Sequence, residues 1–191
     1  MDPLMIDKKS TALVVIDLQK GIAYRETAPY SSETVIANSA KLVNACRKNS
    51  MPVFLVHVVA TEVDRLHVVA DESMRMPGQM PKDWSDFVPE MSPQPGDIII
   101  GKKQWGAFYG TELDLQLRRR SIKTIILCGI ATNFGVESTA RFAYEFGYNQ
   151  IFAEDAMASM TSQMHESSVN FVLRRIGLVR KTSEILQHLQ G

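Results

Sequence analysis

The chain has 191 residues, of which 45% are hydrophobic and 22% charged, and its 21 Lys and Arg residues balance its 21 Asp and Glu residues. This composition is typical of a globular protein, and we expect a single domain spanning residues 1–191. A formal net charge of zero argues against nucleic acid and anionic membranes as partners. No stretch reaches the ~18 apolar residues of a membrane span. The two cysteines form no CxxC motif or disulfide framework, so a cytoplasmic location is expected.

Short apolar runs alternate along the chain with segments of helical periodicity. Strands are expected at 11–18, 52–59, 97–102, 124–130, 150–155 and 178–180, and helices at 35–46, 111–120, 163–176 and 183–190, with a further helix after the fourth strand that ends at Gly147. Continuous apolar strands separated by helices are typical of a parallel sheet that is buried on both faces. The pattern therefore predicts an α/β fold of three layers with right-handed crossovers.

The segment 60–96 interrupts this alternation. It contains Trp84 and five prolines, at positions 77, 81, 89, 93 and 95. Such a segment is too long for a plain connection in a compact domain. Three interpretations stay open: a lid, a contact between copies in a homo-oligomer, and an irregular excursion that packs on its own domain.

Charged residues follow two of the predicted strands. Asp17 comes after the apolar run of the first strand, and Lys102 ends the third. In open parallel sheets, ligands bind beyond the carboxyl ends of the strands, so these two residues and the turn at 129–135 are candidates for one site. A paired Asp and Lys can perform acid–base work, although each is also compatible with an ordinary loop residue or a helix cap. The helix that begins after the turn offers free N–H groups to an anion, unless Thr132 or Asn133 caps it.

Four motifs in this order resemble the isochorismatase-like hydrolases, which form a family of the cysteine hydrolase superfamily. They are VVIDLQ at 14–19, KKQWGAFYGTELDLQLRRR at 102–120, LCGIATNFGVESTARFAYEFGY at 127–148 and AEDAMAS at 153–159. The resemblance covers most of the chain, and it is greatest to an uncharacterised bacterial branch that carries QWGAFYGT. It implies a doubly wound, six-stranded, mainly parallel sheet.

The resemblance also implies a set of site residues. Most members of the family use an Asp–Lys–Cys triad, and the motifs place its aspartate at Asp17 and its lysine at Lys102. The cysteine belongs where this chain has Gly135. The family carries a non-proline cis peptide, here between Ile130 and Ala131, and this bond would aim the N–H groups of Ala131 and Gly135 at one point.

Two aromatic residues follow the motif lysine, and their roles stay open. Trp105 and Phe108 are expected either to wall the pocket or to pack in the core. The resemblance implies a small-molecule substrate and a homo-oligomer. The metal-binding members of the family carry an Asp and a His two positions apart, whereas Asp64 and His67 are three positions apart. We therefore expect neither a metal nor another cofactor.

Gly135 has no side chain, so thiolate catalysis has no nucleophile at this position. The true isochorismatases of the family are similar in carrying glycine there, although they usually have a tyrosine where Ala131 stands. They hydrolyse a vinyl ether, a reaction that needs an acid rather than a covalent nucleophile. The sequence therefore suggests a hydrolase in which Asp17 is the acid and Lys102 orients it or holds a substrate carboxylate. An inactive binding or scaffold homologue and an amidohydrolase that uses Ser138 or water are the alternatives.

Overall fold

A single parallel sheet organises the protein. The computed structural model describes residues 4–59, 61, 63, 66, 68–72 and 80–189. In these residues six strands pair in the order β3-β2-β1-β4-β5-β6, and every pair is parallel. The strands are β1 (Thr11–Ile16), β2 (Val53–Val58), β3 (Ile98–Lys102), β4 (Thr124–Ile130), β5 (Asn149–Ala158) and β6 (Leu178–Arg180). The predicted doubly wound α/β fold with a six-stranded sheet is therefore confirmed.

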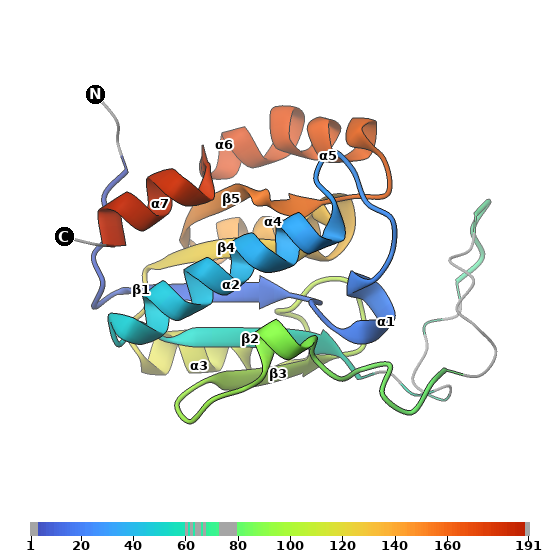
Figure 1. Cartoon of the computed structure of the whole chain (residues 1–191), viewed down its shortest axis with the longest axis horizontal. Helices are drawn as coiled ribbons and strands as arrows, with labels where there is room; N and C mark the ends of the chain where they lie inside the picture. The colour runs from blue at the N-terminus through green and yellow to red at the C-terminus, as the bar shows by residue number, and fades with distance from the viewer. Residues whose placement is uncertain are drawn as a thin grey trace.

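Helices cover both faces of the sheet, with α2 and α7 on one face and α3 and α4 on the other (Figure 1). The helical segments are α1 (Lys20–Ala23), α2 (Ser32–Lys48), η2 (Pro89–Met91), α3 (Leu113–Arg119), η3 (Thr132–Val136), α4 (Glu137–Glu145), α5 (Ser162–Ser168), η4 (Val169–Leu173), α6 (Arg174–Ile176) and α7 (Thr182–Leu189). None of the helices in the described ranges is long and apolar enough to span a bilayer.

The two faces of the sheet explain the continuous apolar runs. In β1, Leu13 and Val15 pack in the core cluster that contains the apolar residues of α2 and α7, whereas Val14 and Ile16 pack in the cluster beneath α3 and α4. Successive residues of a strand point to opposite faces. Because both faces are covered, the strand needs apolar residues at every position.

Several element boundaries differ from the sequence-based expectation. The first strand ends at Ile16 rather than at residue 18, because Asp17 takes a φ of 54° and leaves the strand conformation. The fifth strand continues to Ala158, past an irregularity in its pairing with β4. The helix expected at 163–176 is divided by a π-helical turn, η4. A single π-helical turn inside a helix is too short to be recognised from apolar periodicity.

The second half of the segment 60–96 packs against its own domain. The side chain of Trp84 is buried, and the N–H of Gly21 donates to the Trp84 carbonyl at 2.9 Å. A Cβ at Gly21 would lie 2.1 Å from the indole, so only glycine leaves room for this contact. This observation favours the packed excursion for 80–96. Part of the remaining segment, including Pro77, lies outside the described residues, so the lid and the oligomer contact stay predictions.

Replacing Gly129 with alanine is expected to destabilise the fold by about 3 kcal/mol or more. Gly129 has a φ of 122°, and its added Cβ would lie 2.0 Å from the carbonyl oxygen of Ile16, which belongs to the neighbouring strand. Because Gly129 and Ile16 lie in paired strands, neither backbone can move away without a large cost in free energy. The free energy of unfolding from urea titration at 25 °C measures this effect.

Gly147 provides a matched control for this prediction. It also has a positive φ, of 79°, but its added Cβ meets no atom within 4 Å. Gly147→Ala should therefore cost only the ~1 kcal/mol of the unfavourable backbone conformation. Equal losses in the two variants would contradict the steric argument at Gly129.

Candidate active site

The candidate site lies at the carboxyl edge of the sheet, where the strand order reverses. From β1 the chain builds β2 and β3 on one side, and then it returns to build β4, β5 and β6 on the other. Such a switch point between β1 and β4 is where ligands bind in open α/β sheets. Asp17 follows β1, and the turn that follows β4 contains Gly135.

Lys102 reaches this point from a strand that is not adjacent to β1. It ends β3, and β2 lies between β3 and β1. Its Nζ nevertheless lies 2.8 Å from Oδ2 of Asp17, and the two side chains are 0% and 7% exposed. The Nζ also donates to the carbonyl of Trp105, which ties the loop after β3 to the same ammonium group. The predicted Asp–Lys pair is therefore brought together by the long side chain of lysine.

The two oxygens of the Asp17 carboxyl group have different environments. Oδ2 is held by Lys102, whereas Oδ1 is buried and has no hydrogen-bond partner among the described residues. Burial raises the pKa of Asp17 above its ordinary value of 3.8, although the charges of Lys102 and His57 act against this rise. A buried carboxyl group with one unpartnered oxygen is suited to carry a proton to a ligand.

Gly135 completes this group of residues. A Cβ at position 135 would lie 2.9 Å from Oδ2 of Asp17 and 3.2 Å from Nζ of Lys102. The turn that carries it begins with a cis peptide between Ile130 and Ala131, as the family resemblance implied, and continues as the π-helical turn η3. The backbone of Gly135 therefore lies directly against the Asp–Lys pair, closer than any residue with a Cβ could come without displacing it.

The other predicted site residues are divided between the site and the core. Trp105 is 53% exposed, and its ring lies 4.9 Å from that of Phe134, which is in the turn. Ala131 is buried at the start of η3. The side chain of Ile130 packs in one core cluster and that of Phe108 in the other. Of the two roles that the sequence left open for Phe108, pocket wall and core, it therefore has the core role.

The turn is held by residues that sequence reasoning did not identify. Thr132 and Asn133 were expected as possible caps, but Ala131 takes the N-cap position. Instead, the Thr132 hydroxyl contacts Nδ1 of His165 at 2.8 Å, and the N–H of Asn133 donates to the Ser159 hydroxyl at 3.3 Å. Since His165 and Ser159 are 33 and 26 positions away from their partners, no local pattern in the sequence signals these contacts.

Neither cysteine is placed to replace the missing thiol. Cys46 and Cys128 are fully buried, and burial raises the pKa of each to about 12. Such thiols stay protonated at neutral pH and are poor nucleophiles. Ser138, the other candidate, faces the loop after β3. A Cβ added at Gly106 in that loop would lie 3.6 Å from the Cβ of Ser138.

Metal ligands do not gather in the part of the chain that the structure describes. No group of three or more His, Cys, Asp or Glu side chains there could hold a metal ion. Asp64 and His67 lie outside the described residues.

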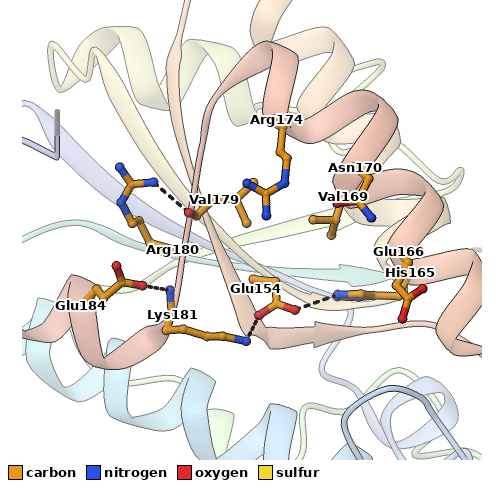
Figure 2. Close-up of a pocket in the computed structure, with 10 residues that line it drawn as sticks. All are labelled: Glu154, His165, Glu166, Val169, Asn170, Arg174, Val179, Arg180, Lys181 and Glu184. Carbon is orange, nitrogen blue, oxygen red and sulfur yellow. Dashed lines mark hydrogen bonds and ion pairs between the residues drawn. The ribbon is translucent and has the colours of Figure 1, made fainter. Parts of the chain in front are cut away.

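A separate cavity of about 330 Å³ is lined by residues that include Glu154, His165 and Lys181, but not by Asp17, Lys102 or Gly135 (Figure 2).

Replacing Gly135 with alanine is expected to reduce stability by about 1–3 kcal/mol, because the methyl group overpacks a filled site. Its contacts at 2.9 Å would include Oδ2 of Asp17 and Cγ2 of Ile16. Urea unfolding measures the loss. Gly106→Ala is the control, since its Cβ meets no atom closer than 3.6 Å and should change stability by no more than ~0.5 kcal/mol. A Gly135 variant as stable as this control would show that the site has room for the methyl group.

Comparisons with known proteins identify the family to which the fold belongs. The family description "Isochorismatase domain" matches residues 11–184. The uncharacterized isochorismatase family protein YwoC of Bacillus subtilis is 48% identical over 192 residues, which cover 100% of both chains. The structure of an isochorismatase family protein from Burkholderia thailandensis has a TM-score of 0.91 and 39% identity, and it covers 96% of this chain and 97% of its own.

A more distant relative has an assigned activity. The ureidoacrylate amidohydrolase RutB of Variovorax paradoxus is 31% identical over 182 residues, which cover 81% of this chain and 71% of the relative. The family match spans nearly the whole chain, and it includes β1, β3 and β4 with the three residues that converge beside the switch point. This chain therefore belongs to the isochorismatase family.

Proposed function

We propose that the protein is a hydrolase that acts on a small, carboxylated metabolite by acid–base catalysis, without a cysteine nucleophile. Asp17 supplies the proton, and Lys102 orients Asp17 and attracts the substrate carboxylate. The observation that carries this proposal is the buried contact of 2.8 Å between Asp17 and Lys102, directly against the backbone of Gly135. An unused buried ion pair is costly to maintain, which supports a role in catalysis.

Hydrolysis of a vinyl ether such as isochorismate fits these groups. The Asp17 carboxyl group donates its proton to the terminal carbon of the enol-pyruvyl double bond, and the carbon that bears the ether oxygen becomes an oxocarbenium ion. Water adds to that ion and loses a proton, which returns to the Asp17 carboxylate. The resulting hemiketal collapses: the bond between its central carbon and the ether oxygen breaks, the proton of the hemiketal hydroxyl passes to that oxygen, and pyruvate and the ring alcohol are released. Each step proceeds without a covalent bond to the protein.

The environment of Asp17 suits the role of an acid. Lys102 holds Oδ2, so the proton resides on Oδ1, the oxygen that has no partner among the described residues. Burial raises the pKa of Asp17 and so increases the protonated fraction near neutral pH. A general acid is most effective when its pKa approaches the working pH.

Amide hydrolysis is the second candidate, because one relative is named as an ureidoacrylate amidohydrolase. In this chain the two cysteines are buried with raised pKa values, so an amidohydrolase would need Ser138 or an activated water molecule. A third candidate is a non-catalytic binding protein that retains the fold. The buried Asp17–Lys102 pair weighs against this last possibility.

The test of the proposal is incubation of the purified protein with isochorismate, followed by measurement of pyruvate, beside parallel incubations with ureidoacrylate and nicotinamide followed for ammonia. We expect pyruvate above the uncatalysed background and no ammonia. Ammonia release that Ser138→Ala abolishes would instead support the amidohydrolase. Release of neither product would reject isochorismate, and Ala131, in place of the tyrosine usual in isochorismatases, would be the first position to consider.

The proposal includes a cytoplasmic homo-oligomer that needs no metal or organic cofactor. Large aromatic side chains are exposed in the loop after β3 and on or just after α4, and exposed aromatic side chains support a contact between copies of the chain. They are Trp105, Tyr109, Phe142, Tyr144 and Phe146. Light scattering after size exclusion should give a mass that is a multiple of the 21.4 kDa chain. Activity should persist after dialysis against a chelator.

A further inference from the structure

A buried polar network lies behind the turn that carries Gly135. It begins at Thr132, in η3, whose hydroxyl contacts Nδ1 of His165 at 2.8 Å. On its other side, Nε2 of His165 lies 3.3 Å from Oε1 of Glu154 in β5. Thr132 and His165 are 0% and 1% exposed. The network therefore connects the turn, the helix α5 and the strand β5; Thr132 and His165 are closed to solvent, whereas the side chain of Glu154 is 17% exposed.

Glu154 is held by several donors at the outer end of this network. The Tyr30 hydroxyl lies 3.0 Å from both carboxylate oxygens, and Nζ of Lys181 donates to Oε2. Figure 2 shows Lys181 and His165 approaching Glu154 from opposite sides. Burial acts to raise the pKa of Glu154, but the hydrogen bonds from His165, Lys181 and Tyr30 lower it to about 2. Glu154 is therefore ionised at any physiological pH.

An ionised Glu154 determines the direction of each hydrogen bond in the network. A carboxylate only accepts, so Nε2 of His165 must carry the hydrogen that is donated to Glu154. In the tautomer that carries its hydrogen only on Nε2, Nδ1 is an acceptor, and the Thr132 hydroxyl donates to it. This is the sequence of groups found in hydroxyl–imidazole–carboxylate triads. The Thr132 hydroxyl, however, is directed at Nδ1 of His165, so we assign it a positioning role rather than contact with a substrate.

We propose that Thr132, His165 and Glu154 form a positioning network that sets the turn 131–135 against Asp17 and Lys102. This inference rests on the proposed function, since the turn matters only if Asp17 acts as the acid. The network holds Thr132, which is adjacent to Ala131 and three positions before Gly135. A second anchor, in which Ser159 donates to Oδ1 of Asn133 at 2.8 Å, supports the next residue of the turn.

The burial of these polar side chains costs more free energy than an apolar contact between the same elements would. Apolar side chains of similar size would pack α5 against β5 without the desolvation of a carboxylate and an imidazole. Directional hydrogen bonds add a defined orientation, which apolar packing does not provide. A displacement of about 1 Å at a reacting group can reduce a rate by ~10²-fold, so orientation of this turn is worth maintaining in a catalyst.

The central test compares Thr132→Val, which removes the hydroxyl at nearly constant shape, with Thr132→Ser, which keeps it. With isochorismate as substrate, we expect Thr132→Val to lower kcat by about 10- to 100-fold and to leave KM within about twofold. Thr132→Ser should recover most of the rate. Thr11→Val is the matched control, because the Thr11 hydroxyl is also buried but has no partner among the described residues. Its kcat should equal that of the wild type.

Two variants at His165 separate the two ends of the network. Asparagine can present an acceptor near the position of Nδ1 and so keep the contact with Thr132, whereas glutamine reaches the position of Nε2 and keeps the contact with Glu154. If positioning operates through Thr132, His165→Asn should retain more activity than His165→Gln. The opposite order, or a Thr132→Val variant that is as fast as Thr11→Val, would overturn the proposal.

A readout independent of turnover distinguishes failure of this inference from failure of the proposed function. The amide resonances of Ala131 and Gly135 in ¹H–¹⁵N spectra should shift in Thr132→Val but stay near their wild-type positions in Thr132→Ser and Thr11→Val. If the wild type releases no pyruvate but these shifts occur, the assigned reaction is wrong and the positioning network stands. If Thr132→Val leaves both amides unmoved, the network is refuted whatever the substrate.

Discussion

Replacing Asp17 with asparagine is expected to lower kcat for pyruvate release by about 10²- to 10⁴-fold, the usual contribution of a general acid. Asparagine has nearly the same shape and can still accept a hydrogen bond from Lys102, which lies 2.8 Å from Oδ2 in the wild type. It has no proton to donate to the vinyl carbon. Initial rates in an assay coupled to lactate dehydrogenase measure the loss. Asp83→Asn, which neutralises an exposed carboxylate paired with Lys20, is the control and should keep the wild-type rate.

The pH dependence adds a second criterion to the Asp17 prediction. Burial raises the pKa of Asp17, so the protonated acid persists above the ordinary value of 3.8 and is lost as the pH rises through the raised value. The rate should therefore fall on the alkaline side of that pKa. The residual rate of Asp17→Asn should lack this descending limb. A variant that keeps the wild-type rate and profile would remove Asp17 from the mechanism.

Replacing Lys102 with methionine is expected to destabilise the protein by about 3–5 kcal/mol at pH 8. Methionine fills most of the volume of the lysine side chain but leaves the Asp17 carboxylate buried without a counter-ion. The pair is almost fully buried, so solvent provides little screening. Urea unfolding at 25 °C measures the free energy of unfolding. Lys20→Met removes an exposed ammonium that pairs with Asp83, and it should cost no more than ~1 kcal/mol.

The loss in Lys102→Met should depend on pH in a definite direction. Without the ammonium, the pKa of Asp17 rises further in the folded state, because Lys102 is the main group that lowers it. A group whose pKa is raised on folding stabilises the protein below its unfolded pKa, and that contribution disappears as the pH rises through the folded value. The deficit should thus shrink at pH 5 relative to pH 8.

A double variant gives the decisive comparison for Lys102. Asp17→Asn together with Lys102→Met removes both charges, so it should be more stable at pH 8 than Lys102→Met alone. If the single and double variants are equally unstable, the loss comes from packing and the buried-charge argument fails.

Much of the architecture was predictable from the sequence, because its determinants are local. The apolar run before Asp17 and those at 124–130 and 178–180 indicated strands, and the bounds of the last two agree with β4 and β6. Uninterrupted apolar character indicated burial on both faces, which in turn required a parallel sheet with helical crossovers. Strand direction then placed Asp17 and Lys102 at the same edge of the sheet.

The contacts within the candidate site depended on the tertiary structure. Lys102 lies two strands away from β1, and only the folded chain shows that its side chain crosses this distance to Asp17. The network behind the turn joins Thr132 to His165 and then to Glu154, a residue of the predicted fifth strand that had no expected role.

The sequence by itself determined the parallel α/β sheet and which residues stand at its carboxyl edge, because apolar runs and helical periodicity are properties of short stretches of chain. The family resemblance had placed Gly135 with Asp17 and Lys102, but the tertiary structure alone decided how closely Gly135 approaches this pair and that His165 supports the turn. These contacts join segments tens of residues apart, and their distances depend on side-chain reach and backbone approach, as at Gly129 against Ile16. A one-dimensional pattern contains no measure of either quantity.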